Sequence, residues 1–496
     1  MKRINSIKQE NLNANLIIMV MLSLLIQIIS VLKTSIVASS FGASDEMDAY
    51  NLANNIVLFV FSFVTASIST IIIPEYANKR NKKSVNTFIT VIYGAMIIVI
   101  TLLILLRMPI ADMLSDRSNS FTKLVANILV VLLTTQFLAS ISNITVAYFQ
   151  CEGRYNTPKI IGFAVQVMTL FALIIFNKIN VFQYTLIVSA SLVMNFALDT
   201  VIAIKFGWRY RPTLLFDEET KSLFKRFLPM VLSTGAYKLS MMIDTILSSF
   251  LDTGKLSILS YTTQISSMVD TVIIGNLTLY LYPKLAKKVS TGGYQKNFWQ
   301  STQFFHLIVC LVSAGFLNVG YEGISMFFQH GVFTTRDSKM VFIGVAIYII
   351  GHQTGVVRDL IYRYFYAIGD TETPAQNSIT VSILNVVLSI ILVWGIGFYG
   401  IIIGTILASF FSTVIILIRF GRKIGFEEKP SKIFGGYLIS TLIFVATVGV
   451  VYLTKYFIPF SNNLVSIFVY GFETVVIFVS FSLLFNRNIL LGVRDL

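Results

Sequence analysis

Residues 15–40 read NLIIMVMLSLLIQIISVLKTSIVASS and contain a single charged side chain, Lys33. A helix needs about 20 mostly apolar residues to cross the hydrocarbon core of a bilayer, and this stretch is long enough. Lys2, Arg3 and Lys8 precede it, as basic residues precede the apolar part of a signal peptide. Its length and the absence of a small-residue cleavage site instead predict a membrane helix that is retained.

The same apolar pattern recurs along all 496 residues, of which 55% are hydrophobic and 12% are charged. An ordinary soluble domain is about 25% charged, so the composition excludes a soluble enzyme. No long polar stretch is left to form the ectodomain of a single-span receptor. The apolar runs predict an all-α integral membrane protein of about fourteen spans, at residues 15–40, 51–73, 86–106, 124–148, 160–176, 183–204, 227–250, 258–281, 302–328, 340–364, 377–396, 399–418, 435–457 and 464–485.

The net charge of +14 is a signal of membrane topology. With the N-terminus in the cytoplasm, 27 of the 38 Lys and Arg residues fall in inner loops and 8 in outer loops. This bias follows the positive-inside rule and predicts that both termini are cytoplasmic. It also explains the basic charge without a nucleic-acid partner. The two cysteines, Cys151 and Cys310, match no metal-binding spacing.

Two loops of the sequence resemble each other. The pattern YFxxxGxxxTP begins at Tyr148 and again at Tyr364, 216 residues later. A second short pattern, Pro-x-x-Ala, occurs at Pro74–Ala77 and again at Pro283–Ala286. An offset of six spans places both halves in the same membrane orientation, as in parallel-repeat transporters. We therefore expect an N-lobe of spans 1–6 (1–206), a cytoplasmic linker (207–226), a C-lobe of spans 7–12 (227–420) and a C-terminal helix pair (421–496). Two such lobes favour transport by alternating access.

Ionisable side chains within spans are costly and are candidates for function. Lys33 in span 1 and Lys238 in span 7 could project into a shared cavity and hold an anionic group, since ammonium groups suit phosphate or pyrophosphate. Alternatively, either lysine could extend to the membrane interface or neutralise a carboxylate. Arg358 is a further candidate for substrate binding, although with Asp359 and Arg363 it also fits a local ion-pair cluster.

Asp244 has two interpretations, as a ligand of a coupling cation (Na⁺ or a proton) or as the counter-charge of Lys238. Asn385 is predicted as a second ligand of that cation, and Glu473 receives no role. No metal site or other cofactor is predicted. The outer loops lack the acid–base residues that a membrane glycosyl ligase would need, so the chain is not expected to be an enzyme.

The strings FGASDEMDAY at residues 41–50 and YAIGDTETP at residues 366–374 resemble the MurJ (MviN) family. The resemblance runs over essentially the whole chain and includes the number of spans. It implies a flippase of the multidrug/oligosaccharidyl-lipid/polysaccharide exporter superfamily. Such a protein moves lipid II, the undecaprenyl-pyrophosphate-linked peptidoglycan precursor, to the outer leaflet of the bacterial cytoplasmic membrane. The resemblance also implies that spans 13–14 form a groove for the lipid tail.

By position, Lys33 stands where the family usually has an arginine, and Asp48 matches the family's acidic residue at the start of span 2. Two basic positions of the family fall on Phe61 and Gln264. The resemblance thus implies substrate contacts at Lys33, Asp48 and Gln264, with Lys238 or Arg358 replacing the missing cations.

Three alternatives to this function are also compatible with the sequence. The substrate could be another polyprenyl-linked oligosaccharide, such as a capsule, O-antigen or teichoic-type precursor. The chain could be a multidrug/cation antiporter, although these usually have twelve spans. It could also be a scaffold that recruits cell-wall synthesis proteins, which are in any case candidate partners beside the lipid-linked substrate and the bilayer.

Overall fold

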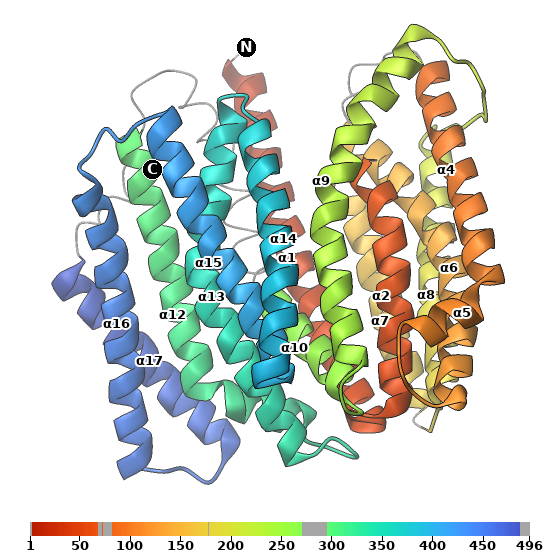
Figure 1. The fold of residues 1–496 in the computed structure, drawn as a ribbon. Helices are drawn as coiled ribbons and strands as arrows, with labels where there is room; N and C mark the ends of the chain where they lie inside the picture. Colours follow the sequence, from red (N-terminus) through yellow and green to blue (C-terminus); the bar gives the residue numbers. More distant parts are fainter. Residues whose placement is uncertain (1, 68–71, 73–81, 177, 270–294, 487–496) are drawn as a thin grey trace. The chain divides into compact units, whose positions relative to one another are not determined.

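The computed structural model describes residues 2–67, 72, 82–176, 178–269 and 295–486, and these form helices and short connections with no β-strand among them (Figure 1). Helices satisfy their backbone hydrogen bonds internally, as a membrane requires. The prediction of an all-α membrane protein is confirmed. The helices are α1 (Lys2–Phe41), α2 (Asp45–Ser67), α4 (Lys82–Leu105), α5 (Arg107–Met113), α6 (Asn119–Cys151), α7 (Asn156–Ile175), α8 (Val181–Lys205), α9 (Glu218–Ser249), α10 (Lys255–Val269), α12 (Gln295–Phe328), α13 (Thr335–Ala367), α14 (Glu372–Ile396), α15 (Phe398–Lys423), α16 (Pro430–Phe457) and α17 (Asn463–Phe485).

Twelve helices in the described ranges are long and apolar enough to cross a membrane, and they match twelve of the fourteen predicted spans. Predicted span 7 (227–250) lies within α9, which carries Lys238 and Asp244 and is not among the twelve. Predicted span 8 (258–281) begins in α10 and continues into residues that the structure does not describe.

The outer faces of these helices carry large apolar side chains, among them Trp394, Phe468 and Leu484, all more than 70% exposed. An apolar side chain gains nothing from exposure to water, whereas hydrocarbon accepts it readily. The exposed surface is therefore suited to lipid.

The chain divides into two compact units, residues 1–257 and 258–496. In the first unit α2 packs against α6 and α9, α6 packs against α8, α1 against α7, and α4 against α9. This division follows packing, whereas the predicted lobes follow the internal repeat. The predicted boundaries at 206, 227 and 420 stay predictions.

In the second unit α12 packs against α13, α16 and α17, while α15 packs against α13 and α14 (Figure 1). Its core is aromatic at one end of α12. The ring of Phe420 lies 5.1 Å from that of Trp299 and 5.1 Å from that of Tyr364, in edge-to-face geometry. Edge-to-face ring pairs are worth about 0.5–1.5 kcal/mol beyond their buried area, so this cluster fixes α12, α13 and α15 together.

The two similar loops of the sequence can be compared in the backbone. Gly153 and Gly369 both have positive φ, 72° and 84°. The following residue donates its N–H to the carbonyl of Phe149 in the first loop (2.8 Å) and of Phe365 in the second (2.9 Å). Glycine is the residue that adopts this left-handed helix end at little cost. The two YFxxxGxxxTP loops therefore have the same local structure. The second pair of motifs, at Pro74 and Pro283, lies outside the described residues.

Candidate functional site

Asp48 lies in the first turn of α2, and its side chain is 0% exposed. Its Oδ1 accepts hydrogen bonds from the N–H and the hydroxyl of Ser257, at 2.7 and 2.6 Å. Its Oδ2 accepts from the N–H of Gly254 at 2.7 Å and from Nη1 of Arg117 at 2.9 Å. Both carboxylate oxygens are thus fully used within the protein.

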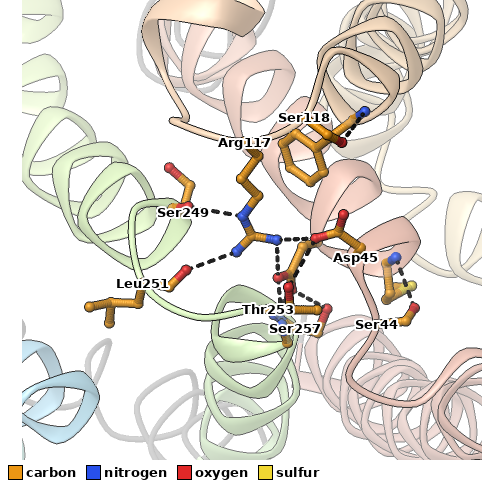
Figure 2. Close-up of polar contacts among 12 residues, drawn as sticks. Ser44, Asp45, Arg117, Ser118, Ser249, Leu251, Thr253 and Ser257 are labelled. Atoms are coloured by element: carbon orange, nitrogen blue, oxygen red, sulfur yellow. Dashed lines mark hydrogen bonds and ion pairs between the residues drawn. The ribbon is translucent and has the colours of Figure 1, made fainter.

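Arg117 lies just before α6, and its guanidinium contacts further residues around Asp48, as Figure 2 shows. Its Nη1 also lies 2.6 Å from Oδ1 of Asp45. Its Nε and Nη2 donate to the carbonyls of Ser249 and Leu251, both at 3.2 Å. The planar guanidinium can serve several acceptors at once. We call this group the Asp48 network; its members are Asp45, Asp48, Arg117, Ser249, Leu251, Gly254 and Ser257.

The local chain geometry explains why Asp48 can reach its partners. The N–H groups of Gly254 and Ser257 stand at the start of α10, where a helix has unsatisfied donors and the positive end of its dipole. Gly254 has φ +86°, and a Cβ there would lie 2.5 Å from the carbonyl oxygen of Ala43. Only glycine therefore allows the α9–α10 connection to approach the end of α1 this closely.

The network joins segments that are far apart in sequence: the start of α2, the loop before α6 and the connection between α9 and α10. The Asp48–Arg117 pair is buried, because the Arg117 side chain is only 10% exposed. A buried ion pair is weak evidence for added stability, but removing one partner leaves an uncompensated buried charge. The network therefore fixes these three segments to one another.

Two amides extend this junction along α2. Asn51 donates to the Ser257 hydroxyl at 3.5 Å, and Asn55 donates to the Thr245 hydroxyl of α9 at 3.3 Å. Polar contacts between helices in a membrane replace bonds that water cannot supply there. Asp244, the residue before Thr245 in α9, is itself buried.

Lys33 is half-buried in α1, and its Nζ donates to Oε1 of Gln166 in α7. The contact accompanies the packing of α1 on α7. The amide oxygen holds the ammonium without neutralising it, so the positive charge remains available to an anion. Lys33 is thus a positioned cation within a spanning helix.

Lys238 is half-buried in α9, and its Nζ lies 5.7 Å from the centroid of the neighbouring Tyr237 ring. Among the ion pairs of the described residues, none joins Lys238 to Asp244. Nor does any described contact join Lys238 to Lys33. The two lysines lie on helices with different packing partners. Helix α1, which carries Lys33, packs against α7, whereas α9, which carries Lys238, packs against α2 and α4.

The other predicted residues belong to the second unit. Gln264 is half-buried in α10. In α13, Nε of Arg358 lies 2.8 Å from Oδ1 of Asp359, and its Nη1 donates to the Ser409 hydroxyl at 2.9 Å. Oδ1 of Asn385 in α14 accepts from Ser389 at 3.3 Å. Oε1 of Glu473 in α17 accepts from Thr454 at 2.7 Å.

The structure therefore places Asp48 against the α9–α10 connection and Lys33 on a different helix pair, α1 with α7. Sequence reasoning missed Arg117 and Gln166. Arg117 could have been noticed as a cation in the same predicted outer region as Asp45 and Asp48, whereas nothing in the sequence pairs Gln166 with Lys33. Within the described ranges, no cluster of three or more His, Cys, Asp or Glu side chains could hold a metal ion.

A bundle of apolar spanning helices with positioned charges inside it defines a multi-pass membrane protein of the transporter type. Comparison with known proteins narrows this class. The model of the family described as "Lipid II flippase MurJ" matches residues 37–471. The chain therefore belongs to the lipid II flippase MurJ family.

Individual relatives agree with this assignment. A probable lipid II flippase MurJ of Rickettsia prowazekii is 25% identical over 424 residues, covering 80% of this chain and 81% of the relative. A solved lipid II flippase MurJ in an inward closed conformation has the same fold, with a TM-score of 0.79 and 18% identity, covering 96% of this chain and all of that one. An inward-facing MATE transporter of the MOP superfamily is more distant, with a TM-score of 0.58, 14% identity, and coverage of 79% and 94%.

Proposed function

We propose that this protein is a flippase that moves lipid II, the undecaprenyl-pyrophosphate-linked peptidoglycan precursor, from the inner to the outer leaflet. The observation that carries the proposal is the family match, which spans residues 37–471 of the 496. The twelve spanning helices agree with it, because a lipid-linked substrate must be handled within a bilayer. The protein works in the bacterial cytoplasmic membrane, with both termini in the cytoplasm, and carries out no covalent chemistry.

The substrate's diphosphate requires a cation at membrane depth, and Lys33 is suited to that role. Its ammonium is half-buried in a spanning helix, and its described partner, Gln166, is uncharged. A charge-assisted contact to an anion is stronger in such surroundings than in water. Lys238, Gln264 and Arg358 are secondary candidates for contacts to the diphosphate or the sugars.

Alternating access requires contacts that close one side of the protein and can break. The Asp48 network is suited to this task because it joins α2 of the predicted N-lobe to the α9–α10 connection of the predicted C-lobe. In the predicted topology this junction is on the outer side. Asp48 then acts by closing the transport path, rather than as a direct substrate contact.

Coupling to an ion is part of the same proposal. Asp244 in the first unit and Asn385 in the second, both buried, are each a candidate ligand of Na⁺ or of a proton during the cycle. Cell-wall synthesis proteins are the proposed protein partners, since they consume the flipped precursor. None of these roles requires an organic cofactor.

Depletion of the protein in cells tests the assignment. Lipid II should accumulate in the inner leaflet, where a membrane-impermeant probe added outside cannot reach it, and re-expression should restore labelling. Accumulation of a different undecaprenyl-linked saccharide, with lipid II distributed normally, would assign the chain to another substrate. Unchanged distribution of every such lipid would favour a scaffold over a transporter.

A further inference from the structure

A buried carboxylate in α8 takes part in none of the contacts described above. Asp199 is 2% exposed, and its Oδ1 has no hydrogen-bond partner in the described part of the chain. Ser142 of α6 lies beside it. The Ser142 hydroxyl interacts with this carboxyl group and has no other partner among the described residues. A hydroxyl and a carboxyl group are therefore buried side by side between two spanning helices, and Oδ1 of the carboxyl group is left without a hydrogen bond in the described part of the chain.

Asp199 has no counter-charge among the described residues. Helix α8 packs against α6, α7 and α2, and the ion pairs of the described residues do not include Asp199. The charged and titratable groups carried by these four helices are Asp45, Glu46, Asp48, Tyr50, Lys123, Tyr148, Cys151, Lys159, Tyr184 and Lys205.

An ionised carboxylate in this position would be desolvated and would have no counter-charge among the described residues, which is among the costliest arrangements in a membrane protein. The neutral acid avoids this cost and gains an O–H that can donate to the Ser142 hydroxyl. A metal cation would need several converging oxygen ligands with negative charge, and the described residues supply one carboxylate here. In this apolar setting the neutral acid is therefore the less costly form.

We propose that Asp199 is a proton-binding site of the first unit. It holds a proton while α6 and α8 are packed together and exchanges it with water when the two helices separate. Release transfers the proton from the carboxylic acid to water and leaves the carboxylate; uptake is the reverse. Asp199 lies six residues before Lys205 at the end of α8, which corresponds to about 9 Å along the helix axis, so the path to water is short.

Only one part of this proposal rests on the proposed function, namely the step of the transport cycle at which Asp199 binds or releases its proton. If the protein is a flippase, a proton site in α8 gives it a second titratable position, distinct from Asp244 in α9. Loss of the proton leaves a charge that favours separation of α6 from α8. Rising pH should therefore loosen this helix pair, and falling pH should tighten it.

Infrared difference spectroscopy on the full-length protein in lipid nanodiscs tests proton binding directly. At neutral pH the wild-type spectrum should contain a carboxylic acid C=O band that is sensitive to deuterium and absent from Asp199→Asn. The matched control is Asp116→Asn, the same change at an exposed carboxylate, which should leave the band in place. Identical spectra for wild type and a folded Asp199→Asn variant would overturn the proposal.

A second variant keeps the test decisive if Asp199→Asn does not fold. Ser142→Ala removes the neighbouring hydroxyl and should shift the frequency of the same band without abolishing it. An unshifted band in Ser142→Ala would contradict the proposed pairing. Hydrogen–deuterium exchange provides the helix readout: α8 should lose protection with rising pH in wild type more than in Asp199→Asn. Neither readout uses a lipid substrate, so each can fail independently of the flippase assignment.

Discussion

Nη1 of Arg117 lies 2.9 Å from Oδ2 of Asp48, and the pair is enclosed by the α9–α10 connection. The two residues are 69 positions apart in the sequence. The guanidinium and the carboxylate each make several further hydrogen bonds, so each group's charge is compensated by the other and by backbone dipoles. This relationship makes the junction of α2 with the α9–α10 connection sensitive to single substitutions.

Substitution of Arg117 by Ala should destabilise the protein by about 3–5 kcal/mol, because it leaves the Asp48 carboxylate buried and unpaired. The thermal midpoint of the purified protein in detergent, followed by intrinsic fluorescence, measures the loss. Arg117→Lys should fall between wild type and Ala, since it keeps the charge and loses the planar fork. Lys123→Ala, at an exposed position in α6, is the control; equal midpoints for Arg117→Ala and Lys123→Ala would contradict the importance of the network.

Substitution of Gly254 by Ala should also weaken the junction. The residue has φ +86°, and the new Cβ would lie 2.5 Å from the Ala43 carbonyl oxygen. Adopting this conformation costs a non-glycine residue about 1–2 kcal/mol before the clash is counted. Gly94→Ala in α4, where a Cβ meets nothing within 4 Å, should be neutral or stabilising by up to about 1 kcal/mol. The same thermal midpoints compare the two variants, and a harmless Gly254→Ala would show that the connection can move away.

Substitution of Gln166 by Ala should impair lipid transport while leaving the Lys33 charge in place. The ammonium of Lys33 would lose the amide that positions it, and the cost of a hydrogen bond to a charged group is about 1.5–3 kcal/mol. The expected loss of flipping rate in proteoliposomes is therefore about tenfold or more. Gln183→Ala, which changes the same residue type in the cap of α8, should flip normally; equal rates for both variants would exclude Gln166 as a positioning residue.

The loop after α13 gives a pH-dependent prediction. Although burial acts in the opposite direction, hydrogen bonds from Thr373 and the Lys423 ammonium lower the pKa of Asp370 to about 2. Because folding lowers this pKa, the stabilisation is present above the unfolded value of about 3.9 and is lost as the pH falls toward 2. Asp370→Asn should therefore cost the same stability at pH 5 and pH 8, and less below about pH 4.

Thermal midpoints across that pH range, compared with those of Asp116→Asn as the exposed control, test this prediction. The expected cost is modest, about 0.2–1 kcal/mol for a pair so close to solvent. A cost that grew between pH 8 and pH 5 would mean that the Lys423 contact does not control Asp370.

The sequence predicts the fold well because each spanning helix is specified locally by an apolar run, as in α15 and α16. It predicts α9 less clearly, since Lys238 and Asp244 interrupt the run. The two similar loops could also be recognised in the sequence, because Gly153 and Gly369 each adopt a positive-φ conformation that glycine favours.

The site was less predictable than the fold. Lys33 stands out as a charge inside a span, but its partner Gln166 lies 133 residues away and depends on how α1 packs on α7. Asp48 could be matched to the family's acidic position, yet its contacts with Gly254 and Ser257 are set by the path of the α9–α10 connection. Such distances between helices are a property of packing, and a single sequence does not encode them visibly.

In the proposed function, a positioned Lys33 cation helps a lipid-linked diphosphate cross the membrane. Reconstitution into liposomes with labelled lipid II measures this most directly, comparing wild type, Lys33→Ala, Lys33→Arg and the exposed control Lys225→Ala. Wild type, Lys33→Arg and Lys225→Ala should move lipid II to the opposite leaflet, and Lys33→Ala should be slower by about tenfold or more. Equal rates for wild type and Lys33→Ala, or no lipid II movement by wild type under any ion gradient, would contradict the claim.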